Sequence, residues 1–374
     1  FMDFGYINAR VRAWKGDLFS ETKYSEFLSV DSLEGFVGKL KGTPYGFDLE
    51  EARARFRGKD EITILEKGLK GNLIRTFRKI WDESPSDARI LIKAILSFWD
   101  IYNLKTIIRG IHRGVSPDEL YSILIPAGDF DESALRELTQ LRDIRLLVQV
   151  LDTWGSPYGR PLKECLPGYL KNKEIIGIEL ALDRFVYSFY LPMLKGKNFN
   201  VSLVKELVKD RIDVSNIITL FKFVPSLQSF VSGREDLDKG DFLVKGQSSY
   251  PIFEYYVPDG KRLTEKDFIE LSRCKDMNEL SSGLIVKMKE ENWKEMLRMV
   301  DPTDISMLEV EMEDLIGRGF CNKAVTNPLS IAVIVCFYFR KIREIKNLRL
   351  IGRGKESLIP VKEIKRYLRM GYGL

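Results

Sequence analysis

The chain has 374 residues, a length that suits two to three domains of ordinary size. Hydrophobic residues make up 44% of it, and 59 basic residues against 54 acidic ones leave a net charge of +5. The two signs are interspersed along most of the chain, which excludes a strong nucleic-acid signature. No signal-peptide pattern opens the sequence, and its longest apolar run, 329–339, is shorter than the about 20 residues that a spanning helix needs. We therefore expect a chain without a leader peptide or a membrane span.

The first landmarks in chain order are a turn and a short motif, called the helical pair here, in which two apolar residues four positions apart flank a glutamate. The turn is Thr43-Pro44-Tyr45-Gly46, in which we expect the proline to set one dihedral angle, the glycine to supply a left-handed one and the tyrosine to pack. The pair is Leu65-Glu66-x-x-Leu69. Ser84-Pro85 then has the pattern of a helix start, and apolar residues recur at three- and four-residue steps as far as Arg109. The pattern predicts a helix from Pro85 that stops at Gly110.

These landmarks return 113 residues later. Ser156-Pro157-Tyr158-Gly159 repeats the turn, and Ile178-Glu179-x-x-Leu182 repeats the helical pair. Asp100-x-x-Asn103-Leu104, near the end of the first long helix, returns as Asp213-x-x-Asn216-Ile217. The second motif lies in a helix that we expect over 200–224. Because one register is kept over so many positions, the sequence contains a duplication.

A third copy follows with a looser register. Glu344-x-x-Asn347-Leu348 repeats the motif, and Leu308-Glu309-x-x-Met312 repeats the helical pair, but no Pro-Tyr-Gly turn accompanies them. The third motif is 131 residues from the second, so about 18 residues have been inserted, a length that surface loops tolerate. A loop-rich stretch near 232–261 is the expected insertion. Asn327-Pro328 predicts the start of the third motif helix, and Gly352 or Gly354 its end.

A period near 113 residues is too long for a short solenoid repeat and fits a small domain. We therefore predict an all-α fold of three similar helical domains, over residues 1–115, 116–226 and 227–374. The three motif helices should superpose through Asn103, Asn216 and Asn347. Two interpretations of these asparagines stay open: they satisfy backbone groups of a neighbouring helix or loop, or they contact a partner directly. Pro44 and Pro157 are expected to be architectural.

A basic residue stands six positions after each asparagine: Arg109, Lys222 and Arg353. One interpretation is that each cation complements the dipole of its own helix. The other is that the three form a ring at one end of the molecule and face an acidic partner surface. From Arg340 to Arg369 the chain is also locally basic, which indicates a solvated helical face, an acidic protein partner or proximity to anionic lipid.

No catalytic constellation emerges from the sequence. His112 is the only histidine, so serine–histidine triads and multi-histidine metal sites are excluded. The cysteines (Cys165, Cys274, Cys321 and Cys336) are scattered, and we expect neither a zinc site nor a disulfide, in a reducing cytoplasmic setting. The run 352–357 lacks the spacing of a phosphate-binding loop. We expect no enzyme, no cofactor and no metal.

Three segments carry a resemblance to a known family. They are Tyr6-x-x-Ala9-Arg10-Val11-Arg12-Ala13, the motif helix from Asp100 to Arg109, and Glu344-Ile345-Lys346-Asn347-Leu348-Arg349 running into Gly354-Lys355. Together they resemble the C subunits of the archaeal-type and bacterial vacuolar-type rotary ATPases, which correspond to the d subunit of the eukaryotic vacuolar enzyme. The likeness covers nearly the whole chain. The second copy departs from the pattern at Ile217 and Lys222, and lacks the Gly-Lys turn.

The resemblance implies a funnel of three helical domains around a pseudo-threefold axis. It also implies a non-catalytic central-stalk component of a rotary proton- or sodium-translocating ATPase or ATP synthase, a socket that couples the central shaft to the membrane rotor ring. Such a chain would be monomeric when isolated and peripheral on the cytoplasmic face of the cell membrane. Two alternatives are an unrelated helical-repeat scaffold for protein–protein contacts and a nucleic-acid adaptor using the basic C-terminal unit. A nucleic-acid partner is not expected, because aromatic residues are not interleaved with the basic ones.

Overall fold

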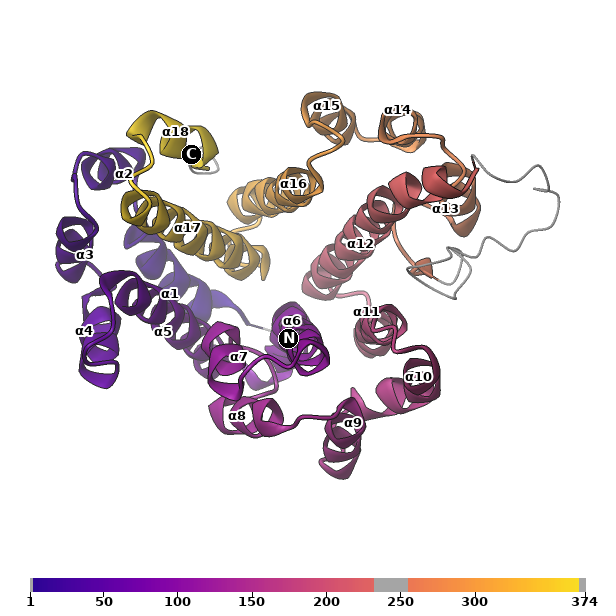
Figure 1. Cartoon of the computed structure of the whole chain (residues 1–374). Helices are drawn as coiled ribbons and strands as arrows, with labels where there is room; N and C mark the ends of the chain where they lie inside the picture. The colour runs from indigo at the N-terminus through magenta and orange to yellow at the C-terminus, as the bar shows by residue number, and fades with distance from the viewer. Residues whose placement is uncertain (1–2, 232–254, 370–374) are drawn as a thin grey trace. The chain divides into compact units, whose positions relative to one another are not determined.

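The computed structural model describes residues 3–231 and 255–369 (Figure 1). Within these ranges the chain forms helices and no strand, which confirms the predicted all-α class. Residues 232–254, most of the expected insertion, lie outside the described residues. No helix in the described part is long and apolar enough to span a membrane.

The helices run in chain order through both described ranges. The first set is α1 (Gly5–Gly16), α2 (Glu21–Leu28), α3 (Leu33–Lys41), α4 (Gly46–Arg55), α5 (Glu61–Glu83), the short 3-10 helix η1 (Ser86–Ala88) and α6 (Arg89–Arg113). The second set is α7 (Pro117–Ile123), α8 (Glu132–Gln140), α9 (Ile144–Thr153), α10 (Gly159–Asn172), α11 (Ile176–Met193) and α12 (Phe199–Val231). The last set is α13 (Glu265–Leu271), α14 (Met277–Lys287), α15 (Glu291–Met299), α16 (Ile305–Thr326), α17 (Ala332–Glu356) and α18 (Val361–Tyr367).

The described residues divide into two compact units. Unit 1 draws on Phe1–Ile92, Ile125–Ala127 and Gly317–Leu374, and unit 2 on Lys93–Leu124 and Gly128–Ile316. In unit 1 the third motif helix, α17, packs against α1, α3 and α5 (Figure 1), so the last motif is held by the first elements of the chain. In unit 2 the second motif helix, α12, packs against α11, α13 and α14.

Helix starts repeat along the chain as the motifs do. The residue before α2, α8 and α13 accepts a hydrogen bond from the backbone N–H three positions on; these residues are Ser20, Asp131 and Thr264. The residue before α3, α9 and α14 likewise accepts a bond from the first turn; these are Ser32, Asp143 and Asp276. Such caps satisfy N–H groups that the helix itself leaves without an acceptor. These six helices therefore begin with the same kind of side-chain cap.

The predicted ends of the first and third motif helices were wrong. Helix α6 passes through Gly110 and ends at Arg113, before Gly114 with its φ of +70°. Helix α17 passes through Gly352 to Glu356. A Cβ atom at Gly110 would overlap Leu120, and one at Gly352 would overlap Leu65. These glycines therefore permit close packing between elements rather than ending a helix.

Three further boundaries differ from the prediction. Helix α6 begins at Arg89 because residues 86–88 form a 3-10 turn, and α17 begins at Ala332 rather than at the proline four residues earlier. Helix α12 continues through Pro225 to Val231 instead of ending before it. A proline inside a helix removes its own N–H donor but does not prevent the following residues from remaining helical.

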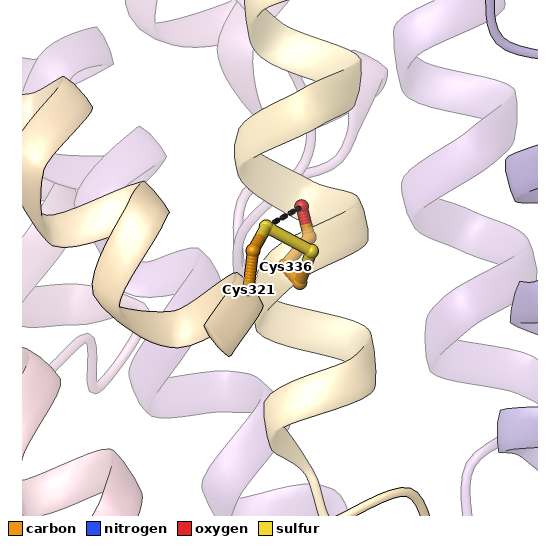
Figure 2. Close-up of a disulfide and its surroundings, with 2 residues drawn as sticks. All are labelled: Cys321 and Cys336. Carbon is orange, nitrogen blue, oxygen red and sulfur yellow. Dashed lines mark hydrogen bonds between the residues drawn. A yellow bond between two sulfur atoms is a disulfide. The ribbon is translucent and has the colours of Figure 1, made fainter. Parts of the chain in front are cut away.

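A disulfide joins Cys321 and Cys336, which corrects the expectation that no cysteines pair (Figure 2). Cys321 lies near the end of α16 and Cys336 in the second turn of α17, and both are buried. The connection between the helices folds back, so that the two Cα atoms are 4.7 Å apart. A separation of 15 residues gives no sign of this contact in the sequence, because it depends on how the two helices meet. Cys165 and Cys274 are free thiols.

Candidate functional site

The acidic residue of each repeated motif is buried and holds a loop that is distant in sequence. We call these three residues the acidic anchors: Asp100 on α6, Asp213 on α12 and Glu344 on α17. The exposed fraction is 0% for both aspartates and 3% for the glutamate. A buried carboxylate is tolerated only where donors surround it, so each anchor fixes the position of the groups that donate to it.

Glu344 is the anchor of unit 1. Its carboxylate accepts hydrogen bonds from the backbone N–H of Phe19 at 2.7 Å and from the hydroxyl of Tyr45 at 2.5 Å. The ammonium of Lys341, one turn earlier on α17, donates to the same carboxylate at 3.1 Å and to the Tyr45 hydroxyl at 2.7 Å. Burial raises the pKa of Tyr45 well above its usual value and lowers the pKa of Lys341, against the attraction of Glu344. The tyrosine is the one in the first Pro-Tyr-Gly turn.

Asp100 uses the second Pro-Tyr-Gly turn in the same way, inside unit 2. It accepts hydrogen bonds from the backbone N–H groups of Asp129 at 2.9 Å and Phe130 at 3.2 Å, and from the Tyr158 hydroxyl at 3.2 Å. Tyr158 stands immediately before α10, as Tyr45 stands before α4. No described cation forms an ion pair with Asp100; Lys93, on the same helix, pairs with Asp129. Burial raises the pKa of Asp100 to about 7.

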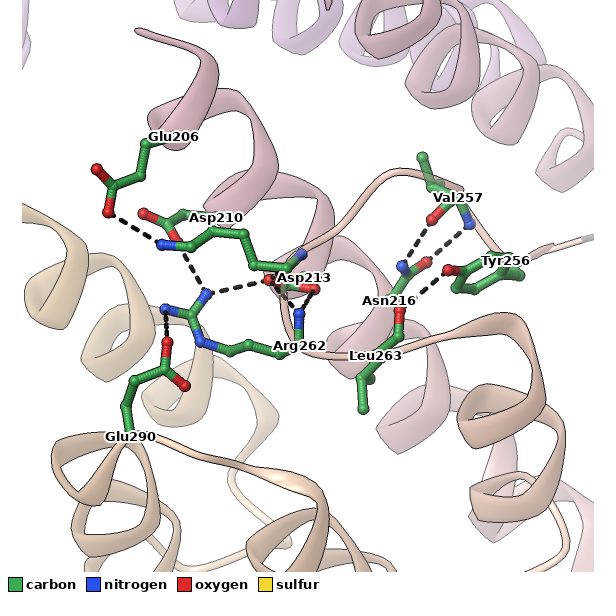
Figure 3. Close-up of polar contacts among 10 residues, drawn as sticks. Glu206, Asp210, Asp213, Asn216, Tyr256, Val257, Arg262, Leu263 and Glu290 are labelled. Atoms are coloured by element: carbon green, nitrogen blue, oxygen red, sulfur yellow. Dashed lines mark hydrogen bonds and ion pairs between the residues drawn. The ribbon is translucent and has the colours of Figure 1, made fainter. Parts of the chain in front are cut away.

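Asp213 has a different set of donors, also inside unit 2 (Figure 3). The backbone N–H groups of Lys261 and Arg262 donate to it at 3.0 and 3.1 Å, and one guanidinium nitrogen of Arg262 approaches it at 3.0 Å. Arg262 also contacts Asp210 at 2.8 Å and Glu290 at 3.1 Å. Burial raises the pKa of Asp213, while the backbone donors and Arg262 act in the opposite direction.

Glu290 explains why Arg262 is needed. It stands immediately before α15, where the equivalent helices α4 and α10 have Tyr45 and Tyr158. A glutamate offers no hydroxyl donor and adds a second negative charge, so an arginine between the two carboxylates replaces the tyrosine. The anchor of the second motif helix, Asp213, is thus kept, and Arg262 takes the place of the tyrosine that binds the other two anchors.

The repeated asparagines are all buried. Asn216 exchanges two hydrogen bonds with the backbone of Val257, each 2.8 Å long (Figure 3). Asn347 exchanges two with the backbone of Arg369, at 2.9 and 3.1 Å. Asn103 lies on α6 with 0% of its surface exposed. Each anchor and its asparagine lie on one face of a motif helix, three residues apart.

The two repeated prolines lie in the turns that present the anchoring tyrosines. The carbonyl of Pro44 accepts hydrogen bonds from the side chains of Asn72 at 3.0 Å and Arg75 at 3.2 Å, both on α5. Arg75 and Asn72 also bind the buried carboxylate of Asp48. Pro157 directly precedes Tyr158 in the turn before α10. These contacts tie the first turn to α5.

Two members of the predicted cation set form ion pairs within the chain. Arg109 contacts Glu179 through two nitrogens at 2.6 and 2.7 Å, and Arg353 contacts Glu66 at 2.8 and 2.6 Å. These glutamates are the ones in the repeated helical pairs, so a repeated arginine binds a repeated glutamate each time. The corresponding third ion pair, between Lys222 and the glutamate of the third helical pair, Glu309, is not formed. Both residues are exposed, and neither has an ion-pair partner among the described residues.

The residues that the sequence analysis considered for phosphate binding or catalysis make hydrogen bonds within the chain. Lys355, in the glycine-containing run, is buried and donates to the carbonyls of Leu28 and Val30. His112 lies near the end of α6 with Nδ1 3.4 Å from the Tyr169 hydroxyl. Among the described residues, no three histidine, cysteine or acidic side chains gather as a metal site would require.

The raised pKa of Asp100 predicts an unusual dependence of stability on pH. Because its pKa is about 7 in the folded chain and its ordinary value is 3.8, the folded state binds more protons between these limits. Its contribution to the free energy of unfolding therefore falls as pH rises through this window, by at most about 1.4 kcal/mol per pH unit. Asp100→Asn removes this contribution. The stability of the variant relative to the wild type, measured by urea unfolding, should therefore increase as the pH is raised from 5 to 8. A constant difference across that range would contradict the assignment.

Comparisons with known proteins agree over nearly the whole chain. The family described as ATP synthase (C/AC39) subunit matches residues 7–367. The C subunit of the A-type ATP synthase of Methanocaldococcus jannaschii is 28% identical over 366 residues, covering 98% of this chain and 86% of that protein. The corresponding protein of Archaeoglobus fulgidus is 27% identical over 97% of this chain and 95% of its own length.

A bacterial relative extends the similarity. The C subunit of the V-type ATP synthase of Deinococcus radiodurans is 24% identical, over 97% of this chain and 90% of that protein. The family resemblance drawn from the motifs is thereby confirmed. The three acidic anchors and the two arginine–glutamate ion pairs all lie within the residues that match the family. The chain belongs to the ATP synthase (C/AC39) subunit family, which includes the C subunits of A-type and V-type ATP synthases.

Proposed function

We propose that the chain is a non-catalytic central-stalk component of a rotary ATPase or ATP synthase, a socket that couples the central shaft to the membrane rotor ring. The observation that carries this proposal is the family match over residues 7–367. We further propose that the three repeat domains, 1–115, 116–226 and 227–374, surround a pseudo-threefold axis. In this role the chain is peripheral on the cytoplasmic face of the membrane through its complex, and monomeric when isolated.

The acidic anchors support a mechanical role. A part that transmits torque must resist deformation, and close-packed helices with satisfied buried polar groups are stiff. Each anchor ties a long helix to a loop at least 29 residues away in sequence, through two or more donors. Glu344 spans the largest separation, because it binds Phe19 325 positions earlier. The motif helices are therefore cross-linked to their surroundings by polar contacts as well as by packing.

We propose Lys222 as the member of the cation set that contacts an acidic partner. Arg109 and Arg353 already share their charge with Glu179 and Glu66, whereas Lys222 is exposed and has no ion pair among the described residues. A cation whose charge is uncompensated attracts an acidic partner more strongly than one already paired. Exchange of Arg109 or Arg353 for glutamate would also place two acids side by side within the chain, so these positions are poor probes of assembly.

Reconstitution of the complex with and without the chain tests the proposal. Without it, the catalytic head should still hydrolyse ATP, while ATP-driven ion transport into vesicles should be lost. The isolated chain should hydrolyse no ATP. Lys222→Glu should weaken assembly, more strongly at low salt because exposed charges are screened at high salt. Arg109→Gln is the matched control, since it removes a cation that is already paired.

Two outcomes separate the parts of the proposal. Ion transport that persists without the chain would refute the coupling role. Normal assembly of folded Lys222→Glu, together with lost transport in the complex that lacks the chain, would refute only the Lys222 contact.

A further inference from the structure

Unit 1 contains a cavity of about 250 Å³ between α1, α16 and α17. Three cations line it: Arg12 and Lys15 from α1, and Arg340 from α17. The rest of its wall is apolar and includes Phe337 and the Cys321–Cys336 disulfide. None of the described residues that line it is acidic. The cavity therefore combines a cationic rim with an apolar wall, and the coupling role proposed above makes no use of it.

Two of the three cations have no acidic partner among the described residues. Lys15 is half-buried and makes no ion pair there. Arg12 donates to a backbone carbonyl, that of Pro328, at 2.5 Å. Burial, followed by the charges of Arg340 and Arg12, lowers the pKa of Lys15. Like charges held together at a partly enclosed site disfavour one another, and an anion placed among them relieves that cost.

A disulfide and an aromatic contact hold the helices around the cavity together. The disulfide joins the end of α16 to the start of α17 on one side of it. Trp14, next to Lys15 on α1, packs against Phe337 with ring centroids 6.1 Å apart. Helix α17 begins at Ala332 beside the cavity, and the positive end of its dipole adds to the potential there. A preformed cationic recess of this kind is typical of a ligand site.

We propose that this cavity binds a phosphate-type oxyanion on a small body, as a soluble phosphate ester or as the headgroup of an anionic phospholipid. Arginine and lysine together suit phosphate, since the guanidinium donates two parallel bonds and the ammonium adds a compact charge. The size favours a small ligand, because pockets for drug-sized molecules measure roughly 300–1,000 Å³. The apolar wall accommodates the carbon atoms next to the phosphate. The proposal stands independently of the coupling role.

Calorimetric titration of the full chain with glycerol phosphate at low ionic strength tests this proposal. We expect saturable binding of glycerol phosphate and none of glycerol. The double variant Arg12→Gln/Lys15→Gln should lose at least about tenfold in affinity, since it removes two charge-assisted contacts. Lys59→Gln/Lys362→Gln, which removes two exposed lysines away from the cavity, is the control for net charge and should bind as the wild type does.

A second variant separates the cavity from general attraction to positive charge. Val325 lines the cavity and is 54% exposed, so Val325→Phe should obstruct it without changing any charge. It should weaken binding of glycerol phosphate as the double variant does. Unchanged thermal unfolding and circular dichroism of both variants would show that they remain folded.

Vesicles and inorganic phosphate identify the source of the anion. For a lipid headgroup, phosphatidylglycerol vesicles should carry the chain in flotation and glycerol phosphate should compete, whereas phosphatidylcholine vesicles should not carry it. For a soluble ligand, inorganic phosphate should displace glycerol phosphate and flotation should be absent. The proposal is overturned if glycerol phosphate shows no saturable heat, or if the folded double variant and Val325→Phe both bind it like the wild type.

Discussion

Arg262→Met is expected to lower the free energy of unfolding by about 3–5 kcal/mol, the usual cost of removing one partner from a buried ion pair. The Arg262 side chain is only 6% exposed and contacts Asp210, Asp213 and Glu290. Without it, three carboxylates remain close together, and Asp213 keeps only backbone N–H donors. Urea unfolding followed by circular dichroism measures the loss.

Two further variants make the Arg262 experiment specific. Lys261→Met is the matched control, because the neighbouring lysine also binds Asp210 but its side chain is 28% exposed; its loss should cost no more than about 1 kcal/mol. Glu290→Tyr in the Arg262→Met background should recover part of the stability, since it removes one carboxylate and supplies the hydroxyl that Tyr45 and Tyr158 provide elsewhere. If Arg262→Met unfolds within about 1 kcal/mol of the wild type, Arg262 is not the counter-group of Asp213.

The helical class and the burial of the motif helices were predictable because both follow from local patterns. The apolar stripe along α6 gives the period of a helix, and the return of Asp100, Asp213 and Glu344 in one register marks equivalent positions. Helix ends were less predictable. Gly110 has the composition of a stop signal, but its role depends on the side chain of Leu120, which the local pattern does not include.

The partners of the anchors could not be read from local patterns. Most of the donors are backbone N–H groups in loops, such as those of Phe19 and Asp129, and any residue except proline supplies one. A signal for the tyrosines and glutamates did exist. Tyr45 and Tyr158 repeat at the same offset as Glu66 and Glu179, and a repeated polar residue is a reasonable partner for another repeated polar residue. Neither pairing recurs in the third copy of the repeat. Glu290 stands in place of the tyrosine before α15, and Lys222 has no ion-pair partner among the described residues.

Replacing Lys341 should have an effect of the same size in unit 1. Lys341 and Glu344 have side chains 6% and 4% exposed, and the ammonium also lies 4.2 Å from the centre of the Tyr45 ring. Lys341→Met leaves the buried Glu344 with Phe19 and Tyr45 as donors and no cation among the described residues, so we expect a loss of about 3–5 kcal/mol near pH 8. Lys362→Met, an exposed lysine on α18, should change stability by less than about 0.5 kcal/mol.

The pH dependence of Lys341→Met distinguishes a lost counter-charge from lost packing. In the variant Glu344 would resemble Asp100, which has a tyrosine and backbone donors but no described cation, and whose pKa is about 7. A buried carboxylate without a counter-charge favours its neutral form, so a lower pH should relieve the cost of the missing ammonium. The variant should then recover stability relative to the wild type between pH 8 and pH 5. Adding Glu344→Gln should remove this recovery and reduce the loss at pH 8. A loss that is the same at both pH values would indicate that Lys341 acts through its packing against Tyr45 rather than through its charge.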